Sequence, residues 1–147
     1  MFKHILVPID GSGLSLKAAD LAIEQARLSE AKLTLLHVAR KFPVPEALRR
    51  YLDQEHLTGE AILDIDEATH KLIKDVRRKA NASGIAKVDT IFREGRPSRT
   101  IVEYAEHHRV DAIFMGCRGL TEVEGALLGS VSHKVASLAP CTVVIVR

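Results

Sequence analysis

The sequence predicts a doubly wound α/β fold, in which a five-stranded parallel sheet carries helices on both faces. Five short apolar runs, rich in β-branched and aliphatic residues, alternate with segments of helical periodicity. The runs cover residues 4–9, 32–38, 86–93, 111–115 and 142–146. Strands that alternate with helices form parallel sheets, because each crossover helix returns the chain to the same edge.

Helical patterns fill the gaps between the strands. One apolar face between the first two strands consists of Leu16, Ala19, Ile23 and Ala26. A longer face, before the glycine stop signal at residues 83–84, consists of Ile62, Ile65, Ala68, Leu72, Val76 and Ala80. A helix after Pro97 carries Ile101, Val102 and Ala105, and a last helix from Ser130 carries Val131, Val135 and Leu138 and ends before Pro140.

The polarity of the strands predicts their order in the sheet. The third strand alternates apolar and polar residues, as in Ala86-Lys87-Val88-Asp89, which is typical of an edge. The first, second and fourth strands are apolar on both faces and are expected to be central. A doubly wound order 3-2-1-4-5 satisfies both conditions and leaves the apolar last strand at the other edge.

Composition restricts the class of protein. The 147 residues are 46% hydrophobic and 27% charged, which predicts one globular domain over residues 1–147. A net charge of +2 argues against a nucleic-acid or anionic-membrane partner. No apolar run approaches the ~20 residues of a membrane helix, and the start shows no signal-peptide pattern. Cys117 and Cys141 are expected at opposite ends of the sheet, unpaired, in a reducing cytoplasm.

Two loops at the carboxyl ends of the first and fourth strands could carry chemistry, because ligands bind there in doubly wound sheets. The first loop is Pro8-Ile9-Asp10-Gly11-Ser12-Gly13. The second loop is Met115-Gly116-Cys117-Arg118-Gly119, followed by nine residues and then by Gly129-Ser130 at a helix start. Glycines permit close approach and positive φ, and a helix N-terminus attracts anions. We therefore expect a phosphate site, with the Gly129 N–H and the hydroxyls of Ser130 and Ser132 as donors.

Asp10 has two interpretations. It could compete with Ser12 to cap the first helix, or its carboxylate could accept hydrogen bonds from ribose hydroxyls or hold a metal. His37 could lie at the same sheet edge as Cys117, but nothing in the sequence fixes their distance.

Other nucleotide and metal motifs are missing. The chain has no Gly-Lys-Ser/Thr of a P-loop, and Leu16 stands where a dinucleotide fingerprint needs its third glycine or alanine. The seven histidines show no metal-ligand spacing.

The Gly-x2-Gly-x9-Gly-Ser pattern resembles the ATP-binding signature of the universal stress protein family. The likeness extends from Ile5-Leu6-Val7-Pro8-Ile9-Asp10 to Pro140-Cys141-Thr142-Val143-Val144. It implies a Rossmann-like, adenine nucleotide alpha hydrolase-like fold and an ATP-binding stress-response protein, cytoplasmic and homodimeric. The residues themselves show no clear general base beside the loop and no lysine in the P-loop role, so we expect slow hydrolysis at most.

The resemblance also implies a binding role for particular residues. The residues that would flank adenosine are Pro8, Ile9, Asp10 and Val38. Those on the ribose and phosphate side would be Met115, Gly116, Arg118 and Gly119. The phosphates would lie on Gly129, Ser130, Val131 and Ser132, and Mg²⁺ could accompany ATP. We expect the homodimer to form through residues 142–146, whose apolar edge invites a partner; a further protein partner is not identified.

Two alternatives stay open. The chain could be a Mg²⁺-dependent ATPase or phosphotransferase that uses Asp10, or an interaction protein that holds no nucleotide. Glu122 and Glu124, between the two halves of the signature, would weaken phosphate binding unless they point outward or hold Mg²⁺. The stretch 41–59, in which Leu48, Tyr51 and Leu52 could share a helix face, is interpreted as a variable surface insertion.

Overall fold

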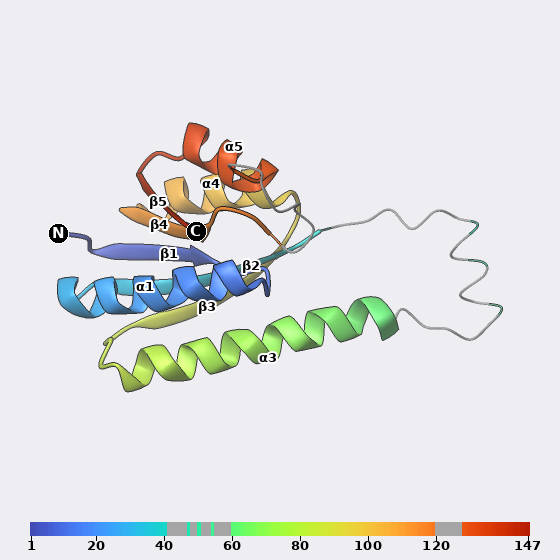
Figure 1. Cartoon of the computed structure of the whole chain (residues 1–147), viewed down its shortest axis with the longest axis horizontal. Helices are drawn as coiled ribbons and strands as arrows, with labels where there is room; N and C mark the ends of the chain where they lie inside the picture. The colour runs from blue at the N-terminus through green and yellow to red at the C-terminus, as the bar shows by residue number, and fades with distance from the viewer. Residues whose placement is uncertain (41–46, 48–49, 51–53, 55–59, 120–127) are drawn as a thin grey trace.

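A computed structural model describes residues 1–40, 47, 50, 54, 60–119 and 128–147 of the chain (Figure 1). In sequence order the elements are β1 His4–Pro8, α1 Gly13–Ser29, β2 Lys32–Ala39, α3 Glu60–Ala82, β3 Val88–Glu94, α4 Pro97–His107, β4 Ala112–Gly116, α5 Ser130–Leu138 and β5 Thr142–Val146. The possible helix at Leu48, Tyr51 and Leu52 lies outside the described residues, as do Glu122 and Glu124.

The five strands form one parallel sheet in the order β3-β2-β1-β4-β5, which confirms the predicted topology. The third strand begins at Val88, two residues later than expected, and the other boundaries agree within one residue. Strands β3 and β5 are the two edges. The chain leaves β1 toward β2 on one side and leaves β4 toward β5 on the other, so the crossovers diverge between β1 and β4.

Helices cover both faces of the sheet (Figure 1), and each face has its own core. Ile5 and Val7 of β1 point into a cluster with α1 and α3, and the intervening Leu6 points into a cluster with α4 and α5. All three side chains are completely buried. Burial of such an aliphatic side chain contributes about 1.5–3 kcal/mol, so these clusters stabilise the sheet that positions the loops.

Two helix faces differ from the prediction. In α3, Ile73 is completely buried while Ala68 is exposed, so the buried face is rotated relative to the expected stripe. The side chains of Ile62 and Ile65 lie outside the described residues. In α5, Leu138 is 66% exposed, because it ends a helix at the sheet's outer edge with no further layer of the described chain above it.

Two further expectations concern the cysteines and the membrane. Cys117 follows β4 and Cys141 precedes β5, and both are free thiols, as predicted. Among the described residues, no helix combines the length and the apolar character that a membrane crossing requires.

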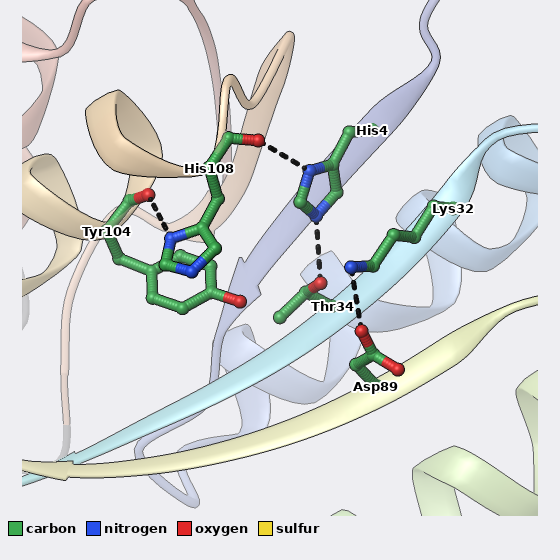
Figure 2. A network of polar contacts seen from close by, with 6 residues as sticks. All are labelled: His4, Lys32, Thr34, Asp89, Tyr104 and His108. Atoms are coloured by element: carbon green, nitrogen blue, oxygen red, sulfur yellow. Dashed lines mark hydrogen bonds and ion pairs between the residues drawn. The ribbon is translucent and has the colours of Figure 1, made fainter.

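A polar network lies at the amino-terminal edge of the sheet, where the strands begin (Figure 2). The Nδ1 atom of His4 lies 3.2 Å from the carbonyl oxygen of His108, and its Nε2 atom lies 2.8 Å from the Thr34 hydroxyl oxygen. A carbonyl only accepts, so Nδ1 donates to His108. When the imidazole is neutral, Nε2 then accepts from the Thr34 hydroxyl. Beside it, Lys32 donates to Asp89 at 2.7 Å and joins β2 to β3.

This network predicts that the folded state loses stability in acid. Burial lowers the pKa of His4 below its ordinary value, and the nearby Lys32 charge acts in the same direction, against the bond to the His108 carbonyl. The unfolded chain therefore binds a proton at His4 more readily than the folded chain does. The contribution of His4 to the free energy of unfolding is fully present above about pH 6.5, the ordinary histidine pKa, and is lost as the pH falls below that value.

Urea unfolding of the parent and of His4→Gln at pH 7.5 and pH 5 measures this contribution. The variant cannot titrate at position 4, so its free energy of unfolding should fall less between the two pH values. Equal losses in both proteins would contradict the assignment to His4.

Candidate functional site

The first and second loops both begin by extending the sheet one residue beyond its strands. The Ile9 N–H donates to the Leu36 carbonyl at 2.8 Å, and the Cys117 N–H donates to the Val146 carbonyl at 2.8 Å. Asp10 and Arg118 are therefore the first residues beyond the sheet on these two strands. Both lie at the same edge of the sheet, where the crossovers that follow β1 and β4 diverge. We refer to this edge, where the strands end, as the carboxyl edge.

Asp10 does not cap α1. The hydroxyl of Ser12 does so by accepting from the Ser15 N–H at 3.2 Å. The Oδ1 atom of Asp10 accepts from the Ser12 N–H at 2.9 Å, which folds the first loop into an Asx turn. One carboxylate oxygen is thus held by the loop, and the other, Oδ2, faces the second loop.

The two glycines of the second loop lie so close to the first loop and to the start of α1 that an added Cβ atom would force a neighbour to move. A Cβ atom on Gly119 would lie 2.7 Å from Asp10 Oδ2. A Cβ atom on Gly116 would lie 2.8 Å from Leu14 Cβ and 3.0 Å from the Leu14 backbone carbon. The predicted close approach is therefore made to this chain's own residues. The expected positive φ is wrong for Gly116 and Gly119; in these loops it occurs at Gly11, at 88°.

Two of the groups expected to donate hydrogen bonds to phosphate donate instead to the Cys117 carbonyl. The Gly129 N–H and the Ser132 hydroxyl each lie 2.6 Å from its oxygen. Ser132 is only 2% exposed and also reaches the Gly129 carbonyl at 3.2 Å. A buried carbonyl needs donors, and these two satisfy it. The expectation that the Gly129 N–H and the Ser132 hydroxyl face a ligand is thus wrong for this arrangement, in which both tie α5 to β4.

The first turn of α5 supplies other donors. Gly129 is the N-cap, with φ −72° and ψ 168° and no side-chain cap bond, so positive φ is not required there. The first intrahelical bond runs from the His133 N–H to the Gly129 carbonyl. The backbone N–H groups of Val131 and Ser132 precede it and have no acceptor within the helix, so the positive end of the helix dipole lies at the carboxyl edge.

The remaining predicted residues divide into core and rim. Ile9 and Met115 are 2% and 5% exposed and belong to the cores on opposite faces of the sheet. Side chains at the rim are half-buried in Pro8, Val38, Arg118 and Val131, and exposed in Ser130. Core residues can shape a site through their backbone, whereas rim residues can meet a ligand with their side chains.

His37 is the site residue whose role sequence reasoning missed. Its Nδ1 atom lies 2.8 Å from the Ile9 carbonyl oxygen, so this nitrogen is committed to the first loop rather than to Cys117. The position of His37 in the sequence could have indicated this role. His37 lies on the same face of β2 as Leu33 and Leu35, close to the carboxyl end of the strand. In the part of the chain that the structure describes, no three His, Cys, Asp or Glu side chains gather as a metal site.

Comparison with known proteins identifies the family. The model of the universal stress protein family matches residues 1–147. Universal stress protein YxiE of Bacillus subtilis is 36% identical over 149 residues, which cover 100% of both proteins. The universal stress protein UspA from Lactobacillus plantarum has a TM-score of 0.84 at 26% identity, covering 99% of this chain and 97% of that one.

A universal stress protein solved in complex with cAMP has a TM-score of 0.72 at 27% identity, covering 99% of this chain and 97% of that one. The sheet order, the two loops and the extent of these matches all agree with membership of one family. The chain belongs to the universal stress protein family.

Proposed function

We propose that this chain is a regulatory protein that binds an adenine nucleotide, ATP foremost, at the carboxyl edge. Asp10 accepts hydrogen bonds from the ribose hydroxyls, and Pro8 and Val38 border the adenine with the Ile9 backbone. Met115, Gly116 and Gly119 shape the ribose side by their backbone. The phosphates lie at the first turn of α5, on Ser130 and the Val131 and Ser132 N–H groups, with Arg118 beside them and Gly129 as the N-cap that aims the helix.

The observation that carries this proposal is the contact between the first and second loops. Gly119 lies directly against the Asp10 carboxylate, and the Cys117 carbonyl fixes the start of α5 to the same loop. A hydrogen-bond acceptor suited to ribose and a helix N-terminus suited to phosphate are therefore held by one loop. A nucleotide has both of these chemistries, and the family relative in complex with cAMP supports an adenine nucleotide.

Hydrolysis is slow at most in this proposal. No lysine in the two loops matches the phosphate-binding lysine of a P-loop, and Asp10 is already engaged by the Ser12 N–H. Turnover of ATP with Mg²⁺, measured for the parent and for Asp10→Asn, tests the enzymatic alternative. Rapid turnover that disappears in the variant would replace the regulatory proposal.

The direct test is the identity of the bound molecule. Mass spectrometry of material released from the purified protein should reveal an adenine nucleotide, and titration of emptied protein should give measurable affinity for both ATP and adenosine. Release of no nucleotide and no heat of binding with either would favour the interaction protein that holds no ligand.

We also propose a homodimer through β5, in the cytoplasm, where Cys117 and Cys141 remain thiols. Strand β5 is an edge, and Val143, Val144 and Ile145 are only half-buried within one chain. An apolar edge of this kind is covered in stable proteins, here by a second copy. Sedimentation at micromolar concentration should give a dimer, and Val144→Lys should give a folded monomer. A monomeric parent would contradict the proposal.

A further inference from the structure

His37 holds the loop that carries Asp10. The bond between its Nδ1 atom and the Ile9 carbonyl, at 2.8 Å, has only one chemical sense, because a carbonyl oxygen cannot donate. Nδ1 therefore carries the hydrogen and donates it. Since Ile9 immediately precedes Asp10, this bond orients the peptide unit from which the Asp10 backbone continues.

The bond lies where the sheet's own ladder stops. Strand β1 ends at Pro8, and the Ile9 N–H still donates to the Leu36 carbonyl of β2 at 2.8 Å. On the carbonyl side of Ile9, the imidazole of His37 makes the contact to β2. The His37 side chain thus adds one hydrogen bond between β2 and the chain that follows β1, at Ile9, the residue before Asp10.

The imidazole is itself held in place by its neighbours. Phe92 of β3 is the register partner of His37, and their ring centroids lie 6.3 Å apart at an interplanar angle of 70°. Phe92 also contacts His70 of α3, and the centroids of these two rings lie 4.1 Å apart. Edge-to-face contacts of this kind favour one ring orientation, so the donor nitrogen stays directed at Ile9.

The Asp10 carboxylate is bound to the first loop through one oxygen and faces the second loop with the other. Its Oδ1 atom is bound by the Ser12 N–H at 2.9 Å, and its Oδ2 atom faces Gly119, where even a Cβ atom would come within 2.7 Å. A displacement of the first loop by a few tenths of an ångström would change both contacts. The backbone before Asp10 must therefore be fixed for the carboxylate to keep its place.

We propose that His37 is a positioning residue of the candidate nucleotide site, because its imidazole fixes the Ile9 carbonyl and thereby the Asp10 carboxylate. The inference rests on the proposed function and adds to it a residue that acts on the ligand only through Asp10. In this proposal the Nδ1–H donor of His37 fixes the Ile9 carbonyl, and neither the aromatic ring nor a charge is required for that role.

The experiment uses the full chain and two substitutions. His37→Leu removes the donor, and His37→Asn places a side-chain N–H close to the position of Nδ1. Titration calorimetry with adenosine and with ATP should show affinities about three- to tenfold weaker for His37→Leu, the effect of one hydrogen bond. The Asn variant should return both affinities to within about twofold of the parent.

A matched control is His4→Leu. Like His37, His4 bonds a backbone carbonyl through Nδ1, but it is buried, at 8% exposure, and lies at the amino-terminal edge. This substitution should lower the melting temperature and leave both affinities unchanged. Parent-like affinities in His37→Leu, or no recovery in His37→Asn, would overturn the proposal.

Hydrogen exchange separates this inference from the proposed function. The Ser12 amide, bonded to Asp10 Oδ1, should exchange faster in His37→Leu and recover its protection in His37→Asn. If the parent binds neither adenosine nor ATP, the proposed function fails, while this exchange pattern still supports the positioning role. Unchanged exchange of the Ser12 amide in His37→Leu overturns the positioning role whether or not nucleotide binds.

Discussion

Asp10→Ala is expected to weaken ATP binding by ~10- to 150-fold, because a hydrogen bond to a charged group contributes ~1.5–3 kcal/mol. The Ser12 N–H also loses its acceptor, which should lower the free energy of unfolding by about 1 kcal/mol. Calorimetric titration gives the first quantity and urea unfolding the second. The loss of affinity should appear with adenosine too, since Asp10 is proposed to bind the ribose.

Asp10→Asn is the matched control for this substitution. Its side-chain oxygen can still accept from the Ser12 N–H, so the loop and the stability should be preserved while the negative charge is lost. Affinity should then fall between those of the parent and Asp10→Ala. An Asp10→Ala protein that unfolds more easily yet binds ATP as tightly as the parent would make Asp10 a structural residue only.

Gly116→Ala should destabilise the fold by about 1–3 kcal/mol, the usual cost of overpacking. The added Cβ would lie 2.8 Å from Leu14 Cβ and 3.0 Å from the Leu14 backbone carbon. Neither atom can turn away by a change of rotamer, so the start of α1 must move relative to β4. Urea unfolding monitored by circular dichroism measures the loss.

Gly13→Ala is the control for Gly116→Ala. A Cβ atom there has no neighbour within 4 Å, and Gly13 begins α1. Alanine should leave the stability unchanged or raise it by up to about 1 kcal/mol, because it restricts the unfolded chain. Equal losses in both variants would mean that glycine is needed at Gly116 for some reason other than contact with Leu14.

The sheet could be predicted because its evidence is local. Each strand is a short apolar run, and the alternation in Ala86-Lys87-Val88-Asp89 marks an edge without any knowledge of distant residues. The rotation of α3 could not be predicted in this way. Leu72 and Ile73 are both apolar, and only the packing of the helix on the sheet decides that Ile73 is completely buried while Leu72 is half-buried.

The site shows the same division. The sequence placed Asp10 and the glycine loop at one edge, because parallel strands end together there. It could not assign hydrogen bonds between residues far apart in the chain. The Ser132 hydroxyl could equally serve a phosphate or a carbonyl until the structure brought it to 2.6 Å from Cys117. His37 was missed for a related reason, since its partner, Ile9, is 28 residues away.

The closeness of Gly119 to Asp10 makes these two positions a single unit of sequence variation. A side chain could be accepted at position 119 only where residue 10 is shorter than aspartate or its carboxylate is turned away. Family members that keep an aspartate in this orientation should therefore keep glycine opposite it, and those that lose one should lose the constraint on the other. The pair, rather than either residue alone, separates relatives that retain this arrangement from relatives that have given it up.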